Sequence, residues 1–135
     1  MGLDMFLDRY TPMEPDSKNR PRYMKTRVMY WRKANMVHEW FDNNLPGKYG
    51  EIENCKDYEL ETSTLVALLD DCKMVLNDHS VAENVMPTTS GFFFGSTEYN
   101  EWYFNDVAET AKAIEEILEE FDENDGGWYT YHAWW

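Results

Sequence analysis

Cysteine, long apolar runs and positive charge are scarce in this sequence of 135 residues. Cys55 and Cys72 are too few for a disulfide framework and form no C-x-x-C pair, so reduced thiols are expected. No apolar run reaches the roughly 18 residues that a membrane-spanning helix needs, so no membrane partner is expected. These absences argue against a secreted disulfide scaffold and favour a cytoplasmic location.

Positive charge is missing mainly from the second half of the chain. Residues 1–60 carry ten Lys/Arg and ten Asp/Glu, whereas residues 61–135 carry two lysines and sixteen acids, and the net charge is −14. Such a field repels nucleic acid, so direct nucleic-acid binding is not expected. A host or defence protein with a basic surface is a better partner, and mimicry of nucleic acid is a related possibility. The simpler alternative is that the acidity only maintains solubility.

The signatures of common catalytic and metal sites are also absent. Residues 91–97, GFFFGST, are one residue short of the P-loop spacing and contain no lysine. No serine stands in a G-x-S-x-G setting, and His38 and Asp42, four residues apart, have no third metal ligand placed beside them. We therefore expect no metal and no cofactor, and binding is a better expectation than catalysis.

Aromatic residues are abundant: the sequence has six Trp, nine Tyr and seven Phe. A chain of this length buries roughly two thirds of the surface that its unfolded form exposes, and aromatic side chains supply much of that buried area. Residues 1–135 are therefore predicted to form a single domain.

Apolar spacing predicts the elements of the first half. Alternation over residues 3–10 predicts a strand with Leu3, Met5 and Leu7 on its core side. Residues 11–26 contain three prolines and most of a basic cluster formed by Lys18, Arg20, Arg22, Lys25 and Arg27, so an exposed loop is predicted there. Helical spacing from about Arg27 to Asn44 predicts the first helix, which Pro46 and Gly47 end.

The second half alternates strands and helices in the same way. A short strand is predicted around Tyr58 and Leu60, and then a helix capped by Thr62 or Ser63. The aromatic run in residues 91–95 is predicted to be a strand, Thr97 or Asn100 to cap a third helix that extends to Phe121, and residues 128–135 to form a final strand. The predicted fold is α+β, with three helices packed on one face of a small antiparallel or mixed sheet.

Two polar segments embedded in aromatic sequence form the candidate ligand site. The first lies on the predicted first helix and the second at the start of the third helix. If they meet, a small nucleotide or signal molecule could bind, with Tyr99 or Trp31 stacking on its base and Arg32 meeting its phosphate. A small acid/base enzyme that uses His38 and Glu98 is a weaker alternative. The candidate residues are Trp31, Arg32, Asn35, His38, Ser96, Thr97, Glu98 and Tyr99.

The third helix offers a second candidate surface, because glutamates occupy the side opposite its apolar stripe. This side could bind a basic protein partner. The residues of the predicted acidic face are Glu109, Glu115, Glu116, Glu119, Glu120 and Glu123.

Three stretches, MGLDMFL, YWRKANMVHEWF and GFFFGSTEYNEWYFND, resemble a family of small, largely uncharacterised proteins encoded by bacteriophages and prophages. The stretches are spread over most of the chain. The resemblance implies a phage-type accessory protein in the cytoplasm of a host bacterium. Together with the acidity, it suggests that the protein modulates or inhibits a host or defence protein by binding. Kinase names are sometimes applied to such proteins, but this chain has no phosphate loop and no kinase signature.

Overall fold

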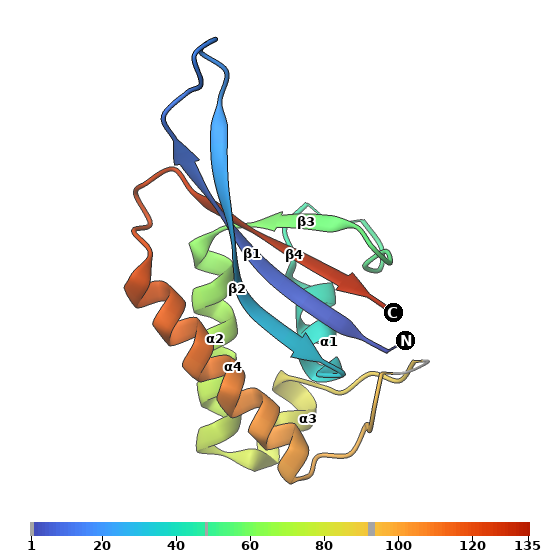
Figure 1. Cartoon of the computed structure of the whole chain (residues 1–135). Coiled ribbons are helices and arrows are strands. Elements are labelled where there is room, and N and C mark those ends of the chain that lie inside the picture. The colour runs from blue at the N-terminus through green and yellow to red at the C-terminus, as the bar shows by residue number, and fades with distance from the viewer. Residues whose placement is uncertain (1, 48, 92–93) are drawn as a thin grey trace.

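A computed structural model describes residues 2–47, 49–91 and 94–135. Within these residues the chain forms one four-stranded sheet and a set of helices (Figure 1). The strands are β1 (Asp4–Met13), β2 (Arg22–Arg32), β3 (Asp57–Leu60) and β4 (Trp128–Trp134). The helices are α1 (Asn35–Asn44), α2 (Thr62–Asn77), α3 (Ala82–Val85) and α4 (Glu101–Glu120), with one 3₁₀ turn, η1, at His79–Val81.

The strand order in the sheet is β2-β1-β4-β3, and every neighbouring pair is antiparallel. The first and last strands of the chain therefore pair at the centre of the sheet, and the N- and C-terminal ends lie close together in Figure 1. This arrangement confirms the α+β prediction and resolves the sheet as antiparallel.

Helices cover one face of this sheet. Leu3, Met5 and Leu7 point toward them and are fully buried, as their alternation predicted. The long helices α2 and α4 pack against each other, and each turns its apolar stripe into the same core. The prediction of three helices is close, since the described residues contain those three and the one-turn helix α3.

The predicted loop over residues 11–26 is wrong, because both of its ends are strand. β1 continues to Met13 and β2 begins at Arg22, so only the tip of a long hairpin is left outside the strands, and this hairpin extends beyond the rest of the sheet in Figure 1. Pro12 is compatible with this strand because β1 pairs with β4 only as far as Tyr10. Beyond that residue no strand among the described residues pairs with this side of β1, which is where a proline without an N–H is tolerated.

The predicted helix over 27–44 is half wrong. Helix α1 begins only at Asn35, and residues 27–32 are the end of β2. It ends at Asn44, before Pro46 and Gly47, as predicted. The helical spacing of Tyr30 with the residues that follow misled the prediction, because pairing with β1 gives residues 27–32 their backbone hydrogen bonds.

Of the remaining secondary-structure predictions, some are confirmed and others are wrong. The strands at β3 and β4 and the helix α4 are confirmed. The predicted caps of α2 are wrong, since Glu61 occupies the N-cap position and no side chain in the described part of the chain caps the helix. The predicted strand in the aromatic run falls partly on residues 92 and 93, outside the described residues, whereas Gly91, Phe94 and Gly95 are not strand.

The state of the two cysteines and the apolar character of the helices also bear on the expectations from composition. Cys55 and Cys72 are both free thiols; Cys72 is buried, and burial raises its pKa to about 12. Among the described residues, no helix is both long and apolar enough to cross a membrane.

Candidate functional site

The end of β2, the start of α1 and the segment 94–100 meet the first turns of α4 and enclose a cavity of about 350 Å³. We refer to it as the Arg32 cavity. Charged groups of both signs and an exposed indole ring surround it. Its lining residues are Arg32, Lys33, Met36, Gly95, Ser96, Glu98, Asn100, Trp102, Tyr103 and Asp106.

The side chain of Asn35 holds one wall of this cavity in place. Its Nδ2 donates hydrogen bonds to the carbonyl oxygens of Phe94 at 3.0 Å and Ser96 at 2.9 Å, and its Oδ1 accepts one from the N–H of Thr89 at 3.2 Å. Asn35 is only 1% exposed, so removing its amide would leave buried backbone groups without partners. Asn35 therefore positions Ser96 and does not itself line the cavity.

Gly95 allows the segment 94–100 to approach β2 closely. Its φ is +87°, and a Cβ at this position would lie 3.2 Å from the Cβ of Lys33 and 3.4 Å from the Lys33 carbonyl oxygen. Glycine adopts this left-handed backbone and tolerates this close contact, which a side chain would not. The close approach places Ser96 and Lys33 around the same cavity.

Helix α4 begins at the cavity because Asn100 caps it. The Asn100 Oδ1 accepts hydrogen bonds from the N–H groups of Trp102 at 3.1 Å and Tyr103 at 3.2 Å. This confirms the cap predicted at Asn100. The cap fixes the first turn, from which Trp102 lines the cavity while remaining 70% exposed.

The charged side chains of the cavity differ in their salt-bridge partners and in their burial. Arg32 lies 3.4 Å from Asp4, whereas Lys33 forms no salt bridge with any described residue. Burial, and secondarily the charge of Glu109, raises the pKa of Asp106 from 3.8 to about 6. This carboxyl group therefore titrates just below neutral pH and can either accept or donate a hydrogen bond near there.

The structure brings together only part of the predicted site. The Thr97 carbonyl accepts a hydrogen bond from Thr88 Oγ1 at 2.9 Å, and the Tyr99 hydroxyl accepts one from the Thr88 N–H at 3.1 Å. These contacts fix the loop outside the cavity lining. The predicted candidates that line the cavity are Arg32, Ser96 and Glu98.

Trp31 belongs to the core and not to the site. It lies in β2, not in a helix, and is 4% exposed. Its Nε1 donates a hydrogen bond to Thr110 Oγ1 of α4 at 2.8 Å. The predicted stacking of Trp31 on a ligand is therefore wrong, because its ring is already enclosed.

His38 lies in α1 against a different cavity of about 260 Å³, which Phe94 and Trp135 also line. Its Nδ1 is 2.6 Å from the hydroxyl of Tyr131. Burial lowers the pKa of His38 from 6.5 to about 4, against the opposing charge of Asp42, so the ring is neutral at pH 7. Because His38 and Glu98 line separate cavities, the acid/base pair considered from sequence is not assembled.

The outer side of α4 and the residues after it form a second, separate surface, which we term the α4 acidic surface. All six of its predicted residues are exposed. Among the described residues Glu115 alone of the six forms a salt bridge, with Lys73 at 3.1 Å. Its residues are Glu109, Glu115, Glu116, Glu119, Glu120 and Glu123.

Among the charged and exposed aromatic residues that line the Arg32 cavity, sequence reasoning missed Lys33, Trp102 and Asp106. A signal was present for Trp102, since it stands beside the apolar stripe of the third helix and not within it. Lys33 could not be placed because its segment was assigned to a helix, and Asp106 resembled an ordinary solvated acid. Within the described ranges, no group of three or more His, Cys, Asp or Glu side chains could hold a metal ion.

Comparisons with family models, with curated proteins and with solved structures give no match for this chain.

Proposed function

We propose that this protein acts by binding and that the Arg32 cavity takes a small nucleotide. The observation that carries this proposal is the joint presence of Arg32, Lys33 and the exposed ring of Trp102 around one cavity. Guanidinium and ammonium groups bind phosphate, and an indole face stacks on a base. Trp102 thus takes the stacking role that sequence reasoning gave to Trp31 or Tyr99.

The acidic groups of the same cavity fit the base more than the phosphate. Glu98 and Asp106 can accept hydrogen bonds from the amino and ring N–H groups of a nucleobase. Recognition would therefore combine cationic side chains for the phosphate, acidic side chains for the base and a stacking ring around one cavity.

A thermal unfolding experiment tests this proposal. A ligand at 100 times its dissociation constant stabilises the folded state by about 2.7 kcal/mol, which for a chain of this size raises Tm by roughly 5–10 °C. Each common nucleotide is added in turn, and Trp102→Ala is expected to abolish the shift that one of them produces. Trp134→Ala is the matched control, because this tryptophan is also exposed, at 57%, but lies outside the cavity. The proposal is rejected if no nucleotide at millimolar concentration moves Tm.

A second candidate function rests on the α4 acidic surface. Glu116 and Glu120 are four residues apart, and Glu109 lies seven residues before Glu116, so these like charges lie along one side of the helix and repel one another. A basic protein surface would relieve that repulsion. We propose on this ground that the surface binds a basic protein, and, from the resemblance of three stretches to phage-encoded proteins, that the protein is a phage-type accessory protein that modulates a host or defence protein in the host cytoplasm.

Affinity capture from bacterial lysate at low and high salt tests the second candidate. A partner of the α4 acidic surface is expected to dissociate at high salt, because exposed charges are screened over about 8 Å at physiological ionic strength. The variant Glu116→Lys/Glu120→Lys should lose this partner. Glu14→Lys/Glu83→Lys, at two exposed positions outside α4, makes the same double charge reversal elsewhere and should retain it. Equal capture by both variants would reject this candidate.

A further inference from the structure

The face of the sheet that points away from the helices is unusually aromatic. Contacts between neighbouring strands show this: the ring of Phe6 lies 5.3 Å from Tyr30 and 6.0 Å from His132, and Tyr10 stacks on Trp128 at 5.4 Å. Tyr30 and Trp134 are 47% and 57% exposed. We refer to this as the open face. Tyrosine, tryptophan and arginine side chains are enriched at the centres of protein interfaces.

A β-bulge increases the number of large side chains on this face. The register between β1 and β2 shifts after Leu7, so that Met29 pairs with Leu7 and Arg27 with Asp8. Without the extra residue, Arg27 and Tyr30 would point to opposite faces of the sheet, since side chains alternate along a strand. With it, both lie on the open face, where the Arg27 guanidinium is 4.3 Å from the centre of the Phe6 ring.

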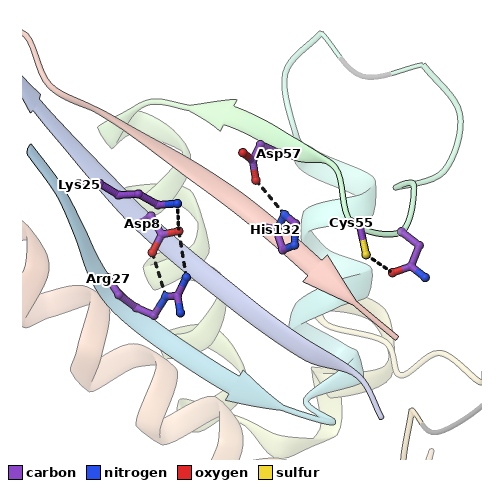
Figure 2. A network of polar contacts seen from close by, with 7 residues as sticks. Asp8, Lys25, Arg27, Cys55, Asp57 and His132 are labelled. Carbon is purple, nitrogen blue, oxygen red and sulfur yellow. Dashed lines mark hydrogen bonds and ion pairs between the residues drawn. The ribbon is translucent and has the colours of Figure 1, made fainter. Parts of the chain in front are cut away.

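Charge on the open face is divided between its two edges. At the β2 edge, Lys25 and Arg27 lie on either side of the Asp8 carboxylate, and at the β3 edge the Asp57 carboxylate accepts a hydrogen bond from His132 Nδ1 at 2.8 Å (Figure 2). Glu59, also on β3, forms no salt bridge with any described residue. The β2 edge therefore carries cations and the β3 edge carries acids.

We propose that the open face binds the open face of a second copy of this chain. A two-fold axis parallel to the strands, between β1 and β4, lays β2 of one copy over β3 of the other. The strand pairing puts Arg27, Asp8, Thr130 and Glu59 in one row across the sheet. The axis therefore places Arg27 of each copy over Glu59 of the other copy, so the dimer contains two such contacts.

The acidity of the chain does not oppose dimerisation through the open face, because most of the acidic residues lie away from that face. The α4 acidic surface belongs to the helical layer, on the other side of the sheet. Two sheets pack about 10 Å apart, and the two helical layers would lie outside them, so the acidic surfaces are separated by more than the roughly 8 Å screening length. A single-stranded nucleic acid, which also stacks on aromatic sheets, fits less well, since Asp57 and Glu59 at the β3 edge and the net charge of −14 would repel its phosphates.

Sedimentation velocity of the full chain over a range of concentrations tests the proposal, and a reversible monomer–dimer equilibrium is expected. Glu59→Arg, which places cations opposite Arg27, is expected to weaken dimerisation at least about tenfold. Arg27→Glu should do the same, and the combined variant Arg27→Glu/Glu59→Arg should restore the dimer, because the two charges exchange places. Glu119→Arg, on the α4 acidic surface, makes the same change as Glu59→Arg and should leave the dimer unchanged.

Arg27→Glu places a second carboxylate beside Asp8 and could prevent folding. Tyr30→Ser is the alternative test, because it removes an exposed ring without adding a charge. It is also expected to weaken dimerisation about tenfold. A chain that stays monomeric at every concentration overturns the proposal. So does a dimer that neither Glu59→Arg nor Tyr30→Ser weakens, or a monomer whose open face binds a single-stranded oligonucleotide.

Discussion

Asp8 and Arg9 are neighbours on β1 with opposite charges, and both are almost fully buried, yet they lie on opposite faces of the sheet. On the helical side, the chain itself encloses Arg9: Asp125 accepts from it at 2.6 Å, the Asp122 carbonyl at 3.1 Å, and the Phe121 and Tyr129 rings lie within 5 Å. On the open face, the Asp8 carboxylate forms ion pairs with Lys25 and Arg27, and both of these side chains are about half exposed.

This difference shows how the same kind of buried charge can serve two purposes. Arg9 fixes the segment after α4 against the sheet, because its guanidinium needs both the carboxylate and the carbonyl in that segment. Asp8 organises two cations at a surface that another molecule can still reach. Stability should therefore depend strongly on the helical side, and association on the open face.

The largest effect is expected from breaking the enclosed pair. Asp125→Ala leaves the buried charge of Arg9 without its carboxylate, which typically costs about 3–5 kcal/mol. Chemical denaturation measures this loss. Arg9→Met is the control, since it removes the charge but keeps an apolar stem between the two rings, and it should cost less than Asp125→Ala. The opposite order would show that the rings, and not the ion pair, hold this segment.

The second-largest effect is expected from pH, because the titration of His38 on the helical side of the sheet changes the free energy of unfolding. His38 has a folded-state pKa of about 4 against 6.5 in the unfolded chain, so the unfolded state binds more protons between these values. The free energy of unfolding therefore keeps its full value above about pH 6.5 and falls by roughly 3 kcal/mol as pH decreases toward 4. Urea unfolding across this range measures it. His38→Gln should flatten the curve, and an unchanged slope would contradict the burial of the ring as its cause.

A smaller effect is expected on the open face. Arg27→Met removes one of the two cations beside Asp8 but keeps a side chain over Phe6, and Lys25 remains 3.7 Å from the carboxylate. Because Arg27 is about half exposed, we expect a loss of about 1 kcal/mol or less. A loss as large as that of Asp125→Ala, measured by the same denaturation, would erase the distinction between the two faces.

The smallest change in stability is expected from Tyr30→Ser, at about 0.5 kcal/mol when measured on the monomer at low concentration. Tyr30 is half exposed, and its hydroxyl bonds to Asp4 at the surface. The same variant should have a large effect on dimerisation. A fall in monomer stability of several kcal/mol would mean that the ring belongs to the core.

Sequence alone determined the features that rest on local patterns. Alternation placed Leu3, Met5 and Leu7 in the core, helical spacing and the Asn100 cap defined α4, and the β-prone aromatic run at the end of the chain predicted β4. The order of the predicted strands and helices indicated the α+β class. These properties depend on residues close together in the chain, so a local reading suffices for them.

Only the tertiary structure decided what depends on distant partners. Residues 27–32 have helical spacing, but β1 supplies their hydrogen bonds, and the bulge after Leu7 then directs Arg27 and Tyr30 to the open face. The Arg32 cavity likewise exists because Asn35 binds the backbone of Phe94 and Ser96, about sixty residues away. No local pattern records such a contact, since its free energy appears only when the chain has brought both segments together.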